Sequence, residues 1–371
     1  MRIGIPKEVK EDEFRVAMTP AGVRELVTHG HELFVGHDAG IGSAFADDEY
    51  AAAGATIVDD PDELWARAEL VCKVKEPLAP EYHRLRSDLV LFTYLHLAAS
   101  APCTHALLDA GTTAIAYETV QRPDGSLPLL APMSEIAGRL APIVGAEFLQ
   151  RQRGGRGVLM GGIAGVRPAR VVVIGTGVAG AAAASIAVGM HAEVTAIDRD
   201  VDRLRALDAL YRGQIRTIAS SVHAIEEACI DADLVIGAVL VVGARAPHLV
   251  SDALVSRMRP GSVLVDIAID QGGCFESSRP TTHSDPTFAI DGSIFYCVAN
   301  MPGSVPHTST HGLTNVTLPY ATAIANHGWK AAVAENPALA RGVNTTGGMV
   351  VSDPVGAAHG LEVTPLAALL G

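Results

Sequence analysis

The stretch RVVVIGTGVAGAAAASIAVGMHAEVTAID, from Arg170 to Asp198, contains the strongest motif in the chain. An apolar run leads into Gly175, Gly177 and Gly180, which form a G-x-G-x-x-G pattern at the start of an alanine-rich segment. Such glycines allow a tight turn, a close approach of backbone to a pyrophosphate, and close packing of a helix on a strand. The N–H groups and dipole of the helix N-terminus then attract phosphates. The stretch therefore predicts a strand, a turn and a helix that bind a dinucleotide; a glycine-rich turn without a ligand is the alternative.

Asp198 closes the next apolar run and indicates which dinucleotide fits. A carboxylate at this place can accept hydrogen bonds from the ribose hydroxyls of the adenosine and repels the 2′-phosphate of NADP. Arg199 follows it directly and weakens that preference slightly. We therefore expect NAD as the cofactor.

On both sides of this stretch, short apolar runs alternate with segments of helical pattern. Alternation of this kind predicts an α/β protein with parallel sheets covered on both faces, one of them a Rossmann-type dinucleotide-binding fold. The expected strands are residues 3–5, 32–35, 56–58, 70–75, 89–95, 113–120, 170–174, 193–197, 234–239, 262–267 and 295–298.

The length of 371 residues suggests two or three domains, and the pattern along the chain predicts two. The segment from Gln121 to Leu130 contains Pro-Asp-Gly and a further proline, which predicts a turn and a hinge. The part after residue 306 has a helical pattern and is too short to fold alone, so we assign it to the first domain. The expected domains are residues 1–128 plus 307–371, for substrate and catalysis, and residues 129–306, for NAD.

Composition excludes several classes of protein. Hydrophobic residues make up 49% of the chain, which allows a large core. A formal net charge of −13 disfavours nucleic acids and anionic membranes as partners. The five cysteines form no Cys-x-x-Cys pair, as is typical of reduced cytosolic proteins. No run of 18 apolar residues occurs, and the charged N-terminus does not resemble a signal peptide. We expect a cytoplasmic location.

Two polar residues follow apolar runs at places where a catalytic group is needed. His96 follows the apolar run in DLVLFTYLHLAAS, and Asp270 follows the one in SVLVDIAIDQGG. Ligands of open α/β sheets bind beyond the carboxyl ends of strands. A histidine there can carry a proton while hydride leaves a carbon, and a carboxylate can orient the imidazole or stabilise a cationic imine. The ordinary alternatives are a core or surface histidine and a strand-capping aspartate.

Cationic residues suggest how a small carboxylate would be held. Arg15 precedes a Thr-Pro helix start, and Lys73 and Lys75 alternate in LVCKVKEP. An arginine can bind a carboxylate through two parallel hydrogen bonds. Lys75 is the better ligand candidate because it is the last cation before the Glu-Pro turn, whereas Lys73 is expected to be solvated. A plain surface position remains the alternative for each.

The whole sequence resembles the bacterial alanine dehydrogenases, close to their actinobacterial members, in the family that also holds the NAD-binding component of transhydrogenases. The blocks that carry this resemblance are RIGIPKE, EFRVAMTPAGV, KVKEP, FTYLHLAAS, AIAYETV, LPLLAPMSEIAGR, GGRGVLMGG, VVVIGTGVAG, DLVIGAVL, LVDIAIDQGGCFE and YCVANMPGSVPHTST. The resemblance implies NAD-dependent oxidative deamination of L-alanine to pyruvate and ammonium, in reverse the reductive amination of pyruvate. It also implies a role in amino-acid catabolism, reduction of other small 2-oxo acids such as glyoxylate, and a two-domain subunit in a homohexamer.

The resemblance assigns roles to individual residues. It implies that Arg15 and Lys75 bind the substrate and that His96 and Asp270 are catalytic. Glu118 and His327 match residues suggested to hold magnesium in some members. The implied cofactor contacts are Ser134, Gly175, Gly177, Val178, Gly180, Asp198, Arg203, Ser220, Val239, Leu240, Ile267, Asp270, Asn300 and Met301; position 203 is lysine in close members of the family.

Three alternatives share parts of this pattern. The NAD-binding component of a transhydrogenase would not need the set of Arg15, Lys75, His96 and Asp270. A saccharopine- or opine-forming dehydrogenase would need room for a second amino acid. An NAD-binding regulator without activity would share the glycine motif alone.

Overall fold

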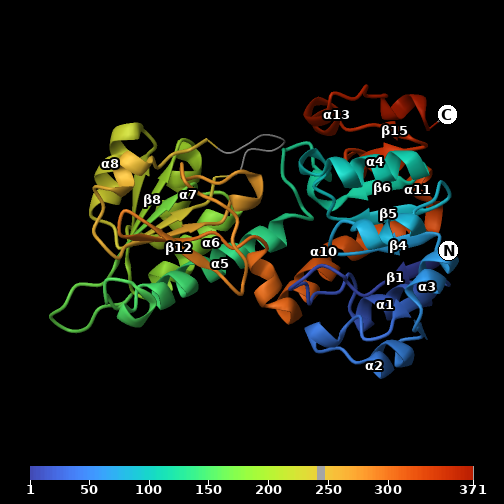
Figure 1. Ribbon diagram of the computed structural model, residues 1–371, viewed down its shortest axis with the longest axis horizontal. Coiled ribbons are helices and arrows are strands. Elements are labelled where there is room, and N and C mark those ends of the chain that lie inside the picture. Colours follow the sequence, from blue (N-terminus) through green and yellow to red (C-terminus); the bar gives the residue numbers. More distant parts are fainter. Residues whose placement is uncertain (240–246, 371) are drawn as a thin grey trace. The chain divides into compact units, whose positions relative to one another are not determined.

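The computed structural model describes residues 1–239 and 247–370, apart from the side chain of residue 271, and the chain divides into two compact units (Figure 1). Unit 1 consists of Met1–Met133 and Gly303–Gly371, and unit 2 of Ser134–Pro302. The expected domains were divided after residues 128 and 306. No helix among the described residues is long and apolar enough to cross a membrane.

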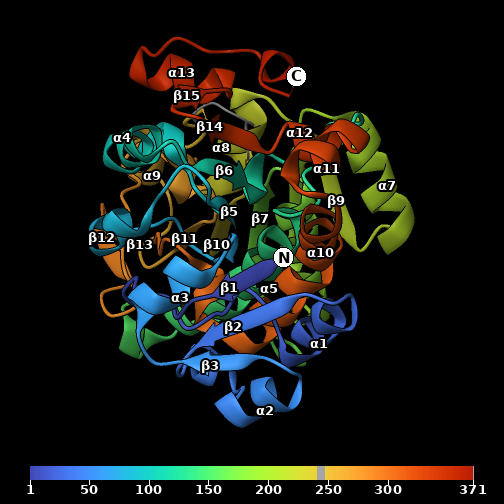
Figure 2. The ribbon, with the colours of Figure 1, turned by 90° about the vertical axis from the view of Figure 1, so that its right-hand side faces the viewer.

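Unit 1 is built on one eight-stranded sheet. Its strands are β1 (Arg2–Ile5), β2 (Glu32–Gly36), β3 (Thr56–Val58), β4 (Leu70–Cys72), β5 (Val90–Thr93), β6 (Thr113–Ala116), β14 (Val343–Thr346) and β15 (Met349–Val350). The order across the sheet is β15-β14-β6-β5-β4-β1-β2-β3. Strands β1 to β6 pair in parallel, and Figure 2 shows β1, β2 and β3 side by side. Strands β14 and β15 pair antiparallel at one edge, so the tail that we expected to be helical also supplies two strands.

Helices connect and cover these strands. They are α1 (Pro20–Thr28), α2 (Asp47–Ala52), α3 (Pro61–Arg67), α4 (Ala101–Ala110), α10 (Pro306–His327), α11 (Trp329–Glu335), α12 (Pro337–Ala340) and α13 (Asp353–His359), and α5 (Ala131–Phe148) leads into unit 2. The local sequence determines where several helices begin. The side chains of Thr19, Asp60 and Ser100 each accept a hydrogen bond from a backbone N–H in the first turn of α1, α3 and α4, respectively. A proline also lies in the first turn of each of these helices.

Unit 2 contains the glycine motif and a seven-stranded sheet. Its strands are β7 (Arg170–Ile174), β8 (Glu193–Asp198), β9 (Ile215–Ala219), β10 (Leu234–Gly237), β11 (Val263–Asp266), β12 (Thr287–Ile290) and β13 (Ser293–Tyr296), and its helices are α6 (Val178–Gly189), α7 (Val201–Tyr211), α8 (Val222–Ile230) and α9 (Asp252–Val255). The order is β12-β13-β11-β10-β7-β8-β9, and only β12 pairs antiparallel among the described strands.

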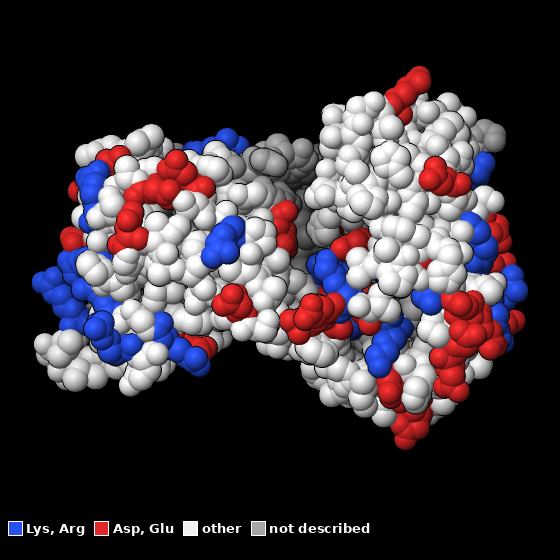
Figure 3. All heavy atoms as spheres, viewed as in Figure 1, with Lys and Arg blue, Asp and Glu red and all other residues white. Residues whose placement is uncertain are grey.

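The prediction of an α/β protein with two largely parallel sheets is confirmed. The central strands β4, β5, β6, β10 and β11 are buried at every residue, as expected for sheets covered on both faces. The predicted strand at residues 113–120 is shorter than expected, because a 3₁₀ turn begins at Tyr117. Acidic and basic side chains are interspersed on the described surface that Figure 3 shows.

Candidate active site

Four of the predicted residues follow four neighbouring strands of unit 1. Strands β6, β5, β4 and β1 lie next to one another and are parallel, so their carboxyl ends share one edge of the sheet. Glu118 follows β6, His96 follows β5, Lys75 follows β4, and Arg15 lies in the segment after β1. We call this edge the carboxyl edge.

Arg15 is buried and held by a carboxylate close to it in sequence. Its Nε lies 2.6 Å from Oε1 of Glu13 and its Nη2 lies 2.5 Å from Oε2, a two-pronged pair. Burial disfavours the charge of both groups, but their mutual attraction outweighs it, so the pKa of Arg15 is raised and the pKa of Glu13 is lowered. The guanidinium plane is therefore fixed in the folded protein.

Lys75 lies near the same carboxylate. Its side chain is buried, and its charge contributes to the lowered pKa of Glu13, after burial and the effects of Arg15. Its backbone carbonyl accepts a hydrogen bond of 2.9 Å from the Thr93 hydroxyl at the end of β5. Glu13, which the sequence did not single out, thus adjoins both predicted substrate-binding cations.

Lys73 is not solvated, and the interpretation from sequence was wrong on this point. Its side chain has no exposed area, and its Nζ lies 3.2 Å from Oε2 of Glu8 and 2.9 Å from Oε1 of Glu81. Oε1 of Glu8 accepts the N–H of Val74 at 2.6 Å. This buried triad, which the sequence could not show because Glu8 lies on a distant segment, joins the segments after β1 and β4.

We expect Lys73→Met to destabilise the protein by about 3–5 kcal/mol, because it leaves two buried carboxylates without their cation. The matched control is Lys10→Met, which breaks the more exposed pair of Lys10 and Glu76 and should cost less than about 1 kcal/mol. Urea unfolding followed by circular dichroism measures both variants. Equal losses would contradict the structural role of the triad.

His96, which follows strand β5, adopts an unusual backbone conformation. Its φ of 49° and ψ of 38° lie in the left-handed region, which costs an L-residue about 1–2 kcal/mol. Its ring stacks near-parallel on that of Tyr94, with centroids 6.1 Å apart, and the Tyr94 hydroxyl donates to the Leu129 carbonyl at 2.6 Å. The strained backbone and the stacked neighbour together fix the position of the His96 ring.

Glu118 holds the backbone of the same loop. Its Oε1 accepts the N–H of His96 at 2.6 Å, and the N–H of Leu95 lies 3.3 Å from Oε1 and 3.2 Å from Oε2. His327 is the last residue of α10 and is exposed. Among the described residues, only His37, Asp38 and Asp47 bring three potential metal ligands together. Glu118 and His327 are not part of that group, so the described residues give no support for a magnesium site at this pair.

The glycine motif of unit 2 has the geometry expected of its three positions. Gly175 has a φ of +93°, which favours glycine, and Gly177 precedes the first residue of α6. A Cβ on Gly180 would lie 1.7 Å from the Gly175 carbonyl oxygen, so only glycine lets α6 pack against the turn. A Cβ on Gly177 would meet only Nη1 of Arg203, at 3.7 Å. The surface of the turn at Gly177 is therefore open to a ligand.

Asp198 ends β8 beside this turn. Its Oδ2 accepts from the backbone N–H (2.6 Å) and the hydroxyl (2.8 Å) of Thr176, and its Oδ1 accepts from the N–H of Asp200 at 2.9 Å. Burial raises its pKa, but these hydrogen bonds and the charge of Arg203 outweigh that effect, so the pKa is lowered. This buried side chain places a negative charge next to the glycine turn.

The remaining predicted cofactor residues are spread over unit 2. Arg203 is exposed on α7, and its Nε lies 3.4 Å from Oδ2 of Asp200. Leu240 lies outside the described residues. The others are Ser134 on α5, Val178 on α6, Ser220 after β9, Val239 after β10, Ile267 after β11, and Asn300 and Met301 after β13.

Asp270 lies farther from its strand than the sequence suggested. Strand β11 ends at Asp266, and Asp270 is exposed in the 3₁₀ turn Ile269–Gln271. Asp266 is fully buried and accepts hydrogen bonds from the N–H groups of Ala268 (3.1 Å) and Cys274 (2.7 Å) and from the Ser278 hydroxyl (2.5 Å). Sequence reasoning missed Asp266, which fixes the loop that carries Asp270.

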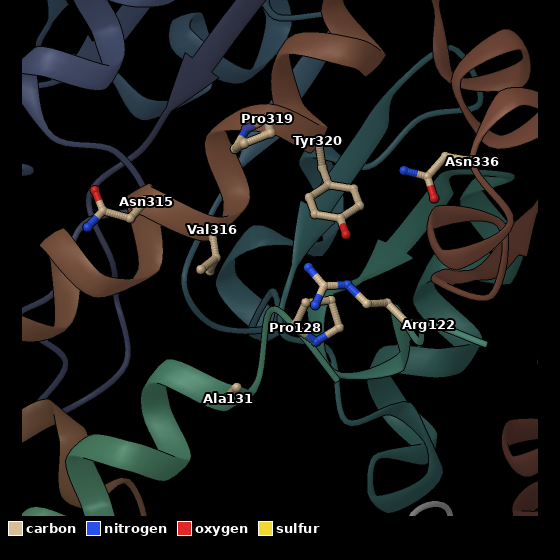
Figure 4. A pocket seen from close by; sticks show the side chains of 8 residues that line it. All are labelled: Arg122, Pro128, Ala131, Asn315, Val316, Pro319, Tyr320 and Asn336. Carbon is tan, nitrogen blue, oxygen red and sulfur yellow. The ribbon is translucent and has the colours of Figure 1, made fainter. Parts of the chain in front are cut away.

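A cavity of about 560 Å³ lies elsewhere in unit 1, between the loop that precedes α5 and the middle of α10. Figure 4 shows the Arg122 guanidinium directed toward the Tyr320 hydroxyl, with Pro128 beside them. Arg15, Lys75, His96 and Glu118 are not among its lining residues. The cavity is therefore distinct from the carboxyl edge.

Comparison with known proteins accounts for both units. The model of the "Alanine dehydrogenase/PNT, N-terminal domain" matches residues 4–137, and that of the corresponding C-terminal domain matches residues 141–353. The chain belongs to the alanine dehydrogenase/PNT family. The chain is 61% identical to an alanine dehydrogenase of Mycobacterium tuberculosis over 370 residues, the full length of both.

Solved structures agree with this family. A structure titled L-alanine dehydrogenase matches with a TM-score of 0.94 and 51% identity, over 97% of this chain and 99% of the other. A transhydrogenase from Sinorhizobium meliloti matches with a TM-score of 0.81 and 25% identity, over 95% and 99%. The resemblance inferred from the sequence is confirmed, and with it an oxidoreductase of the alanine dehydrogenase type.

Proposed function

We propose that this chain catalyses the reversible, NAD-dependent oxidative deamination of L-alanine to pyruvate and ammonium. The observation that carries the proposal is the carboxyl edge, where Glu13 adjoins two buried cations on the sheet edge that also carries His96. A small 2-oxo acid has one carboxylate and one carbonyl oxygen, the groups that such cations and an imidazole recognise.

In the reductive direction, each residue has one task. Arg15, fixed by Glu13, binds the pyruvate carboxylate, and Lys75 contacts the carboxylate or the keto oxygen. His96 moves protons to the oxygen that leaves C2 as ammonia adds. Asp270 stabilises the cationic iminium. NADH, when bound, supplies the hydride that C2 accepts. Exclusion of water from the site and alignment of the hydride donor with C2 increase the rate of the transfer.

NAD fits the residues of unit 2. The open surface at Gly177 leaves room for a pyrophosphate beside the N-terminus of α6, and the carboxylate of Asp198 adjoins the turn. We propose NAD over NADP on this basis. Reduction of glyoxylate, assembly as a homohexamer and a cytoplasmic location remain predictions from the family.

The direct test follows NADH absorbance with pyruvate and ammonium. We expect turnover to require both, to fall when lysine or ornithine replaces ammonium, and to fall when NADPH replaces NADH. Activity with lysine instead of ammonium would favour a saccharopine-type enzyme. Binding of NADH without turnover of any 2-oxo acid would favour a transhydrogenase component or a regulator.

We expect Arg15→Lys to raise the KM for pyruvate by about 10–100-fold, because a lysine cannot reproduce the two-pronged contacts of a guanidinium, which are worth about 1.5–3 kcal/mol. The Kd for NADH should stay unchanged, since Arg15 belongs to unit 1 and the glycine motif to unit 2. Steady-state kinetics and NADH fluorescence measure both values, with Arg24→Lys on the exposed face of α1 as control. An unaltered KM would remove Arg15 from the substrate site.

A further inference from the structure

Glu118 lies where hydrogen bonding between β5 and β6 ends. The parallel register of these strands runs to Thr93 and Ala116, and beyond it the chain after β6 turns into the 3₁₀ turn Tyr117–Thr119. The backbone of β6 therefore offers no regular acceptor to the next N–H groups of the neighbouring strand. The Glu118 side chain reaches back and accepts those of Leu95 and His96.

We propose that Glu118 is a positioning residue for His96, holding its backbone in the conformation from which the imidazole transfers protons. The proposal deepens the proposed function and rests on the catalytic role that it gives to His96. Glu118 does not touch the substrate in this proposal; it acts through the loop that carries the histidine.

Two features favour a carboxylate at this place. The N–H of Leu95 is nearly equidistant from both carboxylate oxygens, at 3.3 and 3.2 Å, and that of His96 lies 2.6 Å from Oε1, so both oxygens take part in holding the two N–H groups. Hydrogen bonds to an ionised acceptor are stronger than those between neutral groups. A charge here can therefore hold a left-handed backbone that His96 would otherwise leave.

The other side of the loop is fixed as well. The Tyr94 ring stacks on the imidazole, and its hydroxyl is bound to the Leu129 carbonyl. The His96 carbonyl accepts the N–H of Ala99 at 2.9 Å, which closes the 3₁₀ turn that follows. Glu118 fixes the amide side of His96 while Tyr94 fixes the ring, so removal of Glu118 should misplace the imidazole without removing it.

The experiment is a double-mutant cycle between Glu118→Ala and His96→Ala. In the wild-type background we expect Glu118→Ala to lower kcat by about 10²-fold, the effect of a catalytic group misplaced by about 1 Å. The KM for pyruvate and the Kd for NADH should change less than about 3-fold, because Arg15 and the glycine motif are untouched. In the His96→Ala background the same substitution should lower kcat no further.

A conservative variant and a surface control complete the set. Glu118→Gln keeps one acceptor oxygen and should retain more kcat than the alanine variant, and it replaces that variant in the cycle if Glu118→Ala does not fold. Glu63→Ala removes an acid of the exposed pair with Arg67 on α3 and should leave kcat unchanged. Rates of the wild type should be the same with EDTA and with added magnesium.

The outcomes separate this proposal from the proposed function. Normal kcat in Glu118→Ala together with an inactive His96→Ala would overturn the positioning role and leave the proposed function intact. Equal losses from Glu118→Ala in both backgrounds, or a wild-type rate that depends on magnesium, would also overturn it. Normal kcat in His96→Ala would reject the catalytic role of His96 and the positioning role with it.

Discussion

Replacement of His96 by alanine is expected to lower kcat by a factor of about 10²–10⁴, the usual contribution of a positioned general acid or base. The loss should fall on kcat because the residue moves protons during the reaction, whereas Arg15 and Lys75 bind the substrate. The histidine sits at the end of β5, in a strained backbone supported by Tyr94 and Glu118. Stopped-flow and steady-state measurements of NADH oxidation with saturating pyruvate and ammonium give the value.

His105→Ala is the matched control for this variant. His105 is exposed on α4 in the same unit, and its Nδ1 contacts only the Ala101 carbonyl among the described polar atoms, at 2.8 Å. We expect wild-type kcat for it. The mechanism would be refuted by His96→Ala and Asp270→Ala variants that both keep near-normal turnover and bind NADH normally.

The place of His96 beyond a strand and of Lys75 before a turn could be predicted because their signals are local. Lys75 and His96 each follow an apolar run that forms a buried parallel strand, and such strands end at one edge. The glycine motif was predictable for the same reason: its turn, strand and helix are contiguous. Arg15 was recognised by its residue type before a helix start, and the structure adds the carboxylate that fixes it.

What could not be predicted depends on contacts between segments distant in the chain. Lys73 looked solvated because a lysine in an apolar strand is costly to bury, yet Glu8 and Glu81 compensate its charge. The role of Glu118 depends on the register between β5 and β6, which no spacing in the sequence reveals. Strand β15 has only two residues, too few for an alternating pattern to appear.

Substitutions in the glycine turn are also expected to have large effects, and two variants distinguish an effect on stability from an effect on NADH binding. Gly180→Ala places a Cβ 1.7 Å from the backbone oxygen of Gly175, so α6 has to move away from the turn. We expect it to destabilise the protein by about 1–3 kcal/mol, as overpacking does, and to weaken NADH binding as well. Thermal unfolding and NADH fluorescence titration measure the two effects.

Gly177→Ala should behave differently because its Cβ meets only Nη1 of Arg203, at 3.7 Å, and its φ of −64° suits any residue. Stability should be unchanged, while the added methyl group occupies the surface where the pyrophosphate approaches. A cost of about 1–3 kcal/mol there raises the Kd for NADH by about 5–150-fold. Gly189→Ala, at the end of α6 with no heavy atom within 4 Å of its Cβ, is the control with unchanged affinity. If Gly177→Ala bound NADH as tightly as the wild type, the turn would not be the site of the dinucleotide.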